Sequence, residues 1–494
     1  MNERSSKYYG ENGIHRVPLW RIGGFALNNT ATNLYLFMMN YVAYYLTGFV
    51  GVAVVTASSF SMMMRIWDGV TDPFIGFVVD RTDGKFGKNR PFMVIGNAIL
   101  CVMSFIMYHV THLLPENTTV RFAFFIVMAA VFYIGYTFQC VVTKSAQTCL
   151  TNDPKQRPLF AVFDGVYNTI LFTVMAMVGA NLGTKYGTME STDLFHELWM
   201  LVAVCSAIFT AIAVISIAPK DRTEFFGTGQ AVRVGLKDYW DTLKNNRAIQ
   251  MLVVSASTDK LATSTKTSTV QIVLFAVIAG NLSLQGTLTG LTSIPILILM
   301  IFAVGGLATT LGMRKAMLIG SIGGIIANAA LALLWLFGDA HSMTNAEGGL
   351  AWSTFTILYV VLTIAFGAFQ GISGNIVIPM TADCADYEVY RTGKYVPGMM
   401  GTLFSFVDKI ISSLAPMIAG MMFAAIGFKQ ALPDVQTPYS TSLHYVSVFL
   451  AHGMIILGLL CNLVALKFYP LTKEKMAEIQ GEIAEIKAKA MAEN

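Results

Sequence analysis

Three charged residues lie at helical spacing inside one apolar stretch of this 494-residue chain. Arg65, Asp68 and Asp72 are three and four residues apart, so a helix would place them on one face. Two carboxylates one turn apart repel each other unless a cation or a proton lies between them. Because carboxylate oxygens are good ligands for hard metal cations, we predict that Asp68 and Asp72 bind a sodium ion or share protons.

Several other apolar stretches also carry polar side chains at helical spacing. A charge near the middle of a membrane helix costs about 2.5–3.5 kcal/mol on insertion scales, so such residues need a partner or a function. For neighbours such as Asp259 and Lys260, a neutralising pair and contact with a solute are both open, and the asparagines could equally be hydrogen-bond partners between helices. The groups are Asn29, Asn33 and Asn40; Thr137, Cys140 and Lys144; Asp164, Tyr167 and Asn168; Asp259, Lys260 and Lys266; and Asp408 with Lys409.

The elements that would position these residues are membrane-spanning helices. Hydrophobic residues make up 55% of the chain and charged residues only 13%, whereas about 25% of a soluble domain is charged. Apolar stretches of roughly 20 residues, the length that crosses a bilayer, recur along nearly the whole chain and leave no room for a separate soluble domain. We therefore predict an all-α membrane protein with twelve transmembrane helices, at 22–47, 53–79, 91–111, 121–147, 159–182, 197–217, 248–279, 284–310, 315–337, 350–380, 396–427 and 441–468.

The longest polar connection divides the twelve predicted helices into two halves of six. The expected organisation is an N-terminal half at 1–217, a central cytoplasmic loop at 218–247, a C-terminal half at 248–468 and a cytoplasmic tail at 469–494. Repeated halves around a central site are common in secondary transporters. In the tail, the spacing of Met476, Ile479, Ile483 and Ile486 is typical of an amphipathic helix, and we expect a solvated or surface-lying segment.

Lys and Arg residues concentrate in the N-terminus, the even-numbered loops and the C-terminus. Because positively charged loops stay in the cytoplasm, we expect a multi-pass plasma (inner) membrane protein with both termini cytoplasmic. Residues 1–20 lack the pattern of a removable signal peptide. The six cysteines have no metal-ligand spacing, and no nucleophilic triad, HExxH motif or phosphate-binding glycine loop indicates an enzyme. We expect no cofactor, no nucleic-acid partner and a monomer.

Three sequence blocks resemble one family of transporters. The first is Arg65-Ile-Trp-Asp68-Gly-Val-Thr-Asp72-Pro73, followed by Asp80, Gly87, Lys88, Arg90 and Pro91; the second is Thr151-Asn-Asp153-Pro154-Lys-Gln-Arg157; the third comprises Ala382-Asp383, Asp386-Tyr387, Thr392-Gly393-Lys394, Lys409 and Gly427-Phe428. Together they resemble the glycoside-pentoside-hexuronide:cation symporter family, the melibiose permease-like branch of the major facilitator superfamily. The resemblance implies the superfamily fold of two six-helix halves and symport by alternating access.

The resemblance also implies a cation site and a gate. It suggests that Asp68 and Asp72 hold the coupling ion, Na+ or H+, with Thr137, Thr71 and Lys409 nearby. It further suggests charge pairs that close the cytoplasmic side in the outward-facing state. The gating residues would be Asp80, Arg81, Arg90, Asp383, Asp386 and Arg391.

The solute site departs from the family pattern. Cys140 stands where the melibiose-type pattern has an aspartate, Lys144 where it has a tryptophan, and Asp164 at or beside an arginine position. These departures argue against a galactoside. Lys144 either pairs with Asp164 or meets a carboxylate on the solute, as in a hexuronide or glucuronide. The family's aspartate on the first helix maps to Asn29 or Thr32, so the candidate solute contacts are Asn29, Thr32, Arg65, Cys140, Lys144, Asp164, Lys260 and Lys266.

The sequence therefore predicts cation-coupled symport of a sugar, glycoside or hexuronide-like polar solute by a protein embedded in the lipid bilayer. A sodium-dependent lysophospholipid or other organic-anion symporter is the alternative, because a related branch of the superfamily shares the two carboxylates of the second helix. A membrane sensor without net transport is a third hypothesis, which solute counterflow in proteoliposomes would test.

Overall fold

The computed structural model describes residues 16–81, 86–151, 156–222, 244–392, 407, 409–479 and 481–482. Some side chains within these helices are not described, and Asp72, Asp80, Arg81 and Lys144 are among them. Asp408, Ile483 and Ile486 lie outside the described residues. The chain forms two compact units, residues 1–230 with 428–432 (unit 1) and residues 231–427 with 433–494 (unit 2).

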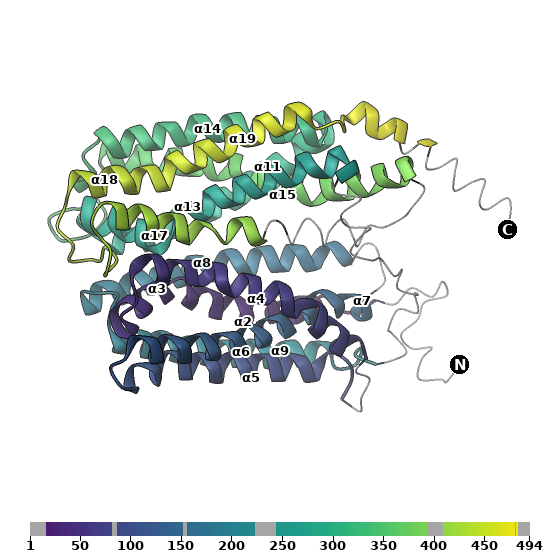
Figure 1. The fold of residues 1–494 in the computed structure, drawn as a ribbon. Helices are drawn as coiled ribbons and strands as arrows, with labels where there is room; N and C mark the ends of the chain where they lie inside the picture. The colour runs from purple at the N-terminus through teal and green to yellow at the C-terminus, as the bar shows by residue number, and fades with distance from the viewer. Residues whose placement is uncertain are drawn as a thin grey trace. The chain divides into compact units, whose positions relative to one another are not determined.

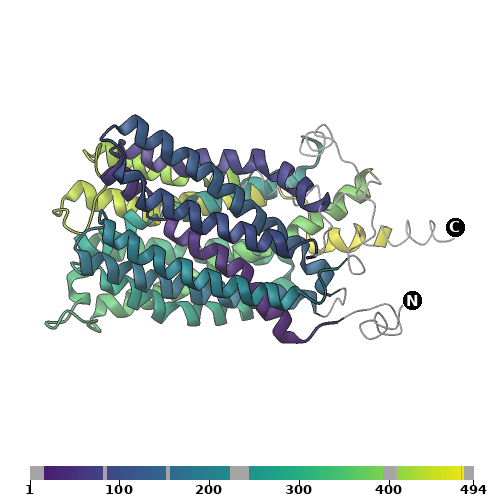
Figure 2. The ribbon, with the colours of Figure 1, turned by 90° about the horizontal axis from the view of Figure 1, so that it is seen from below.

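Unit 1 is a bundle of long helices that run side by side (Figures 1 and 2). Helix α2 packs along α8 and α9, α5 packs along α6 and α9, and α4 packs along α6. Buried apolar side chains from these helices, such as Ile22, Phe25, Met93 and Phe160, form its core. The helices are α2 (Leu19–Met39), α4 (Val54–Arg81), α5 (Arg90–His109), α6 (Thr118–Ser145), α8 (Arg157–Tyr186) and α9 (Thr192–Ile217), with the short α3 (Val42–Tyr45) and α7 (Gln147–Leu150) between them.

Side-chain caps and a glycine set the ends of several helices in unit 1. The Asn117 side chain accepts a hydrogen bond from the backbone N–H of Val120, and Ser191 does the same for Leu194, which satisfies a free N–H at the start of α6 and of α9. Helix α8 ends at Tyr186 and is followed by Gly187, whose φ of 67° is left-handed, a conformation that glycine adopts without steric penalty. Local sequence therefore fixes where these helices begin and end.

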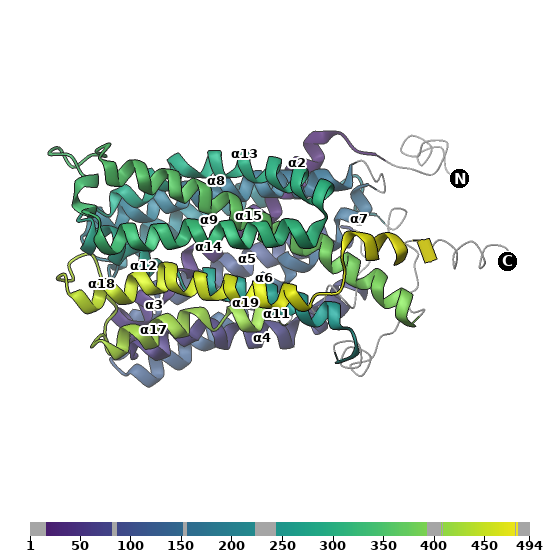
Figure 3. The same cartoon turned by 90° about the horizontal axis from the view of Figure 1, so that it is seen from above.

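Unit 2 is also built from helices, which Figures 1 and 3 show lying side by side. Helix α14 packs along α15 and α19, α13 packs along α15, and α11 packs along α19. The helices are α11 (Arg247–Ser264), α12 (Ser268–Ile272), α13 (Ser283–Leu311), α14 (Met313–Phe337), α15 (Thr354–Thr392), α17 (Ala415–Ala425), α18 (Thr441–Val448) and α19 (Met454–Phe468).

The chain after α19 is part of the core of unit 2. Tyr469, Leu471 and Ile479 are each at most 3% exposed, and they pack in one cluster with Met317 and Met380. The Lys473 ammonium donates to the carbonyl of Thr310 at 2.9 Å. This arrangement differs from the expected solvated or surface-lying tail, because the apolar face of the segment has a protein surface to cover.

The all-helical fold class is confirmed, because the described residues contain long helices, isolated β-bridge residues and no strand. Among these residues, eight helices are long and apolar enough to cross a membrane, and the bent pair α11–α12 would make nine. Helices α2 and α4 are not among them; α2 carries several asparagines and threonines, and α4 carries charges. The prediction of twelve spans is therefore not confirmed.

Candidate functional site

The carboxylate of Asp68 is the centre of a buried polar cluster between α4 and α6. Asp68 and Thr137 are both fully buried. The Thr137 hydroxyl donates to Oδ1 of Asp68 at 2.7 Å, and Nη1 of Arg65 lies 3.7 Å from Oδ2. The structure thus brings together Arg65, Asp68 and Thr137, three of the residues that the sequence singled out.

Contacts around this cluster hold α4 against α6. The indole Nε1 of Trp67 donates to the carbonyl of Ala130 at 2.9 Å, and the Arg65 guanidinium lies 5.7 Å from the centre of the Tyr136 ring, within cation–π range. The Thr71 hydroxyl donates to backbone carbonyls of its own helix, so only its lone pairs remain for a ligand.

This arrangement can hold a positive charge at Asp68. Arg65 supplies that charge in the conformation seen here, and its distance of 3.7 Å is long for a charge-assisted hydrogen bond. A small cation or a proton bound at Asp68 could therefore replace part of the interaction with Arg65. Within the part of the chain that the structure describes, no three His, Cys, Asp or Glu side chains converge as a metal site. The side chain of Asp72, the second predicted ligand, is not described.

A second polar group joins α2 to its neighbours. Nδ2 of Asn29 donates to Oδ1 of Asp164 at 2.7 Å, and Nδ2 of Asn33 donates to Oδ1 of Asn168 at the same distance. The Thr32 hydroxyl is buried and donates to a carbonyl of its own helix. Helical spacing in the sequence places these polar residues on helix faces but does not pair Asn29 with Asp164.

The predicted solute contacts are thus only partly assembled by the described side chains. Cys140 is half-buried on α6. Lys260 is exposed on α11, and Lys266 is half-buried at the bend between α11 and α12. Lys409 is half-buried and lies shortly before α17. The pairing of Lys144 with Asp164 stays a prediction.

Two of the predicted gating arginines have partners inside their own units. Nε of Arg90 lies 3.4 Å from Oδ2 of Asp221, and Nη2 of Arg391 lies 2.9 Å from Oε1 of Glu388. Neither carboxylate was predicted from the sequence as a gating residue. Glu388 could have been found from its spacing of three residues before Arg391, whereas nothing in the sequence connects Asp221 with Arg90, 131 residues away.

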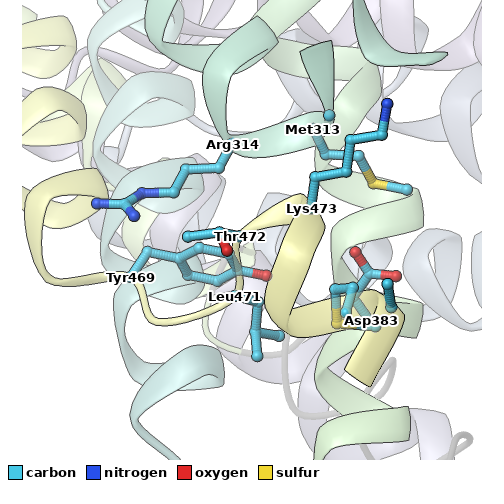
Figure 4. A pocket seen from close by; sticks show the side chains of 10 residues that line it. Met313, Arg314, Asp383, Tyr469, Leu471, Thr472 and Lys473 are labelled. Carbon is cyan, nitrogen blue, oxygen red and sulfur yellow. The ribbon is translucent and has the colours of Figure 1, made fainter. Parts of the chain in front are cut away.

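Asp383 and Asp386 lie near each other at the end of α15. Burial and the neighbouring Asp386 raise the pKa of Asp383 to about 6. Asp383 also lines a cavity of about 270 Å³ beside the residues that follow α19, 469–479, which we call the C-terminal segment (Figure 4). In this view Arg314 and Lys473 extend in opposite directions, and each donates to carbonyls at the end of a helix.

Comparison with known proteins identifies the family. The family model described as "MFS/sugar transport protein" matches residues 24–473. The chain belongs to this family. A glucuronide carrier protein homolog from Escherichia coli (strain K12) is 24% identical over 94% of this chain and 95% of its own length. An isoprimeverose transporter from Lactiplantibacillus pentosus is 23% identical over 97% and 95%.

Solved structures share the fold of this MFS/sugar transport protein. A mutant of the nucleoside transporter NupG superposes with a TM-score of 0.62 and 13% identity, over 90% of this chain and 99% of that chain. A bacterial homolog of the human lysosomal transporter Spinster gives 0.58 and 12%, over 92% and 96%. Membership of this family makes the chain a multi-pass membrane transporter and not an enzyme, and the family predicted from the three sequence blocks is confirmed.

Proposed function

We propose that this chain is a symporter that couples the entry of a cation to the uptake of a sugar or hexuronide-like solute. The observation that carries this proposal is the buried Asp68 carboxylate, with Thr137 at 2.7 Å and Arg65 at 3.7 Å. Burying a carboxylate in a membrane helix costs free energy, so an ionisable residue kept there indicates a functional site. The family membership and the names of the relatives support the same conclusion.

The coupling cation, Na+ or H+, would bind at Asp68 together with Asp72 and the Thr137 hydroxyl. Its charge would weaken the attraction between Asp68 and Arg65 and release the guanidinium for other contacts. The cation would then raise the affinity for the solute, and the solute would raise the affinity for the cation by the same factor. Alternating access would carry both across the membrane.

The solute class is inferred from the candidate contacts and the relatives. One relative is a glucuronide carrier protein homolog and another an isoprimeverose transporter, so anionic and neutral sugars are both candidates. A lysine at position 144 would favour a carboxylate on the solute, unless Asp164 neutralises it. We place the protein in the plasma (inner) membrane as a monomer with both termini cytoplasmic.

Uptake by the purified protein in proteoliposomes tests this function. We would measure accumulation of a radiolabelled glucuronide and of isoprimeverose, under an imposed Na+ gradient in one set and an imposed pH gradient in another. Accumulation of one solute above its external concentration, under at least one of the two gradients, is expected. Equilibration without accumulation under both gradients would contradict coupling, and absence of counterflow for every sugar would contradict sugar transport.

A further inference from the structure

Unit 2 contains a buried carboxylate that has no role in the proposed cation site. Asp259 lies on α11 and is 6% exposed. Its Oδ2 accepts a hydrogen bond of 2.8 Å from Nε2 of Gln370 on α15. Among the described residues, the other oxygen of Asp259, Oδ1, and the amide oxygen of Gln370, Oε1, are both buried and accept no hydrogen bond. The pair therefore has one donor in use and two buried acceptors without a donor.

The charge of Asp259 is also unbalanced within the described residues. No ion pair to Asp259 is formed there, whereas Asp68 has Arg65 nearby. An ionised carboxylate in a membrane-spanning helix without a cation or further donors is strongly disfavoured. One proton on Oδ1 would remove the charge and supply the missing donor at the same time. A protonated carboxyl and a primary amide have complementary donors and acceptors.

The surroundings of Asp259 offer no other described cation. On its own helix, Lys260 is exposed, and Lys266 follows after α11 ends. On α19, Gly458 lies against the Asp259 backbone, and the titratable residues of that helix are Cys461 and Lys467. Helix α17 carries no titratable residue. On α15, the basic residue is Arg391, 21 positions after Gln370 and about 30 Å along a helix, and the nearest acidic residue is Asp383, 13 positions after Gln370.

We propose that Asp259, paired with Gln370, is a proton-binding site of unit 2 that is separate from Asp68. A proton from water on one side binds Oδ1 and forms the neutral acid, and the same proton leaves to water on the other side during the transport cycle. No other bond forms or breaks. The proposal deepens the proposed symport and rests on it for the transport step, whereas the protonated state of Asp259 can be measured without any transport.

Infrared difference spectroscopy of the reconstituted protein tests the protonated state. The spectrum of the wild type minus that of Asp259→Asn at neutral pH should contain the C=O stretching band of a protonated carboxyl. Asn can replace both hydrogen bonds of the acid, so this variant should fold. In a second variant, Gln370→Leu, the band should persist at a higher frequency because the acid has lost its partner. As a control, the spectrum of the wild type minus that of Asp164→Asn should not contain the band assigned to Asp259.

Only ionised-carboxylate bands in the wild type minus Asp259→Asn spectrum would overturn the proposal. Should Asp259→Asn fail to fold, an unchanged carboxyl band in Gln370→Leu would overturn it instead.

Transport gives an independent result: solute counterflow should be retained in Asp259→Asn, and accumulation driven by a pH gradient should fall to the equilibration level. If Asp259→Asn loses counterflow and Asp259 is ionised in the wild type, the Asp259–Gln370 pair would instead bind a hydroxyl group of the solute. If the wild type transports no sugar, the proposed function fails, but the infrared result still decides the protonation.

Discussion

The carboxylate of Asp221 accepts hydrogen bonds from both the backbone N–H and the side-chain Nδ2 of Asn89, at 3.0 and 2.9 Å. It also accepts from the backbone N–H of Arg90, the first residue of α5. A buried carboxylate at a helix N-terminus satisfies N–H groups that the helix leaves free and interacts favourably with the helix dipole. Asp221, which follows α9, thus caps the N-terminus of α5.

We expect Asp221→Asn to lower the melting temperature of the detergent-solubilised protein. Hydrogen bonds to a charged group contribute about 1.5–3 kcal/mol each, and the variant loses that charge and turns one acceptor into a donor facing N–H groups. The matched control is Asp193→Asn, on the exposed first turn of α9, which should change stability by less than about 0.5 kcal/mol. Equal melting temperatures for both variants would show that Asp221 does not stabilise α5.

Substitutions at the Asp68 cluster should uncouple transport while the protein stays folded. Asp68→Asn, Asp72→Asn and Thr137→Val each remove a proposed ligand, so accumulation under the coupling gradient should be lost and counterflow should persist. The control is Thr258→Val, whose hydroxyl donates within its own helix. Normal accumulation by both aspartate variants would place the cation site elsewhere.

A double variant separates the two roles of Lys144. If Lys144 binds a carboxylate on the solute, both Lys144→Ala and Lys144→Ala with Asp164→Ala should fail to take up an anionic sugar. Affinity for a neutral analogue should then be largely retained. If the lysine only neutralises Asp164, the double variant should recover folding and uptake, because removing both partners leaves no buried charge. Binding measured by calorimetry with both solutes distinguishes these outcomes.

Loss of the proton from Asp383 should make unit 2 less stable as the pH rises. The pKa of Asp383 is raised from about 3.9 in the unfolded chain to about 6 in the folded protein. Its stabilising contribution is therefore present below pH 4 and is lost as the pH rises through 6. Asp383→Asn should raise the melting temperature at pH 7.5, by the equivalent of about 1 kcal/mol because the group is partly exposed. It should have no such effect at pH 4, and an equal shift at both pH values would contradict this origin.

Shortening Ile479 should destabilise unit 2. Ile479 is fully buried in the core cluster of that unit, and replacing a buried isoleucine by alanine costs about 2–5 kcal/mol. The control is Ile294→Ala on α13, where the side chain is 64% exposed. Equal melting temperatures for the two variants would mean that the C-terminal segment contributes nothing to the core.

The sequence predicted well the features that depend on local spacing. Apolar length and charge content were enough for the all-helical membrane fold, and helical periodicity placed Asp68 and Thr137 on faces that the structure brings together at 2.7 Å. Pairs between distant segments were missed, because periodicity does not say which helices are neighbours. For Asp259 the sequence left open a pair with its neighbour Lys260 or contact with a solute, but its hydrogen-bond partner is Gln370, 111 residues away.

The C-terminal segment also affects the order in which unit 2 can fold. Its core cluster joins Ala248, near the start of the unit, to Ile479, 231 residues later (479 − 248). During synthesis, α11 reaches the membrane long before the segment that completes its packing is translated. Until the ribosome has made these last residues, the apolar ends of α14 and α15 stay uncovered. Premature termination would therefore leave a membrane-inserted protein with exposed hydrophobic surface, a target for quality-control proteases.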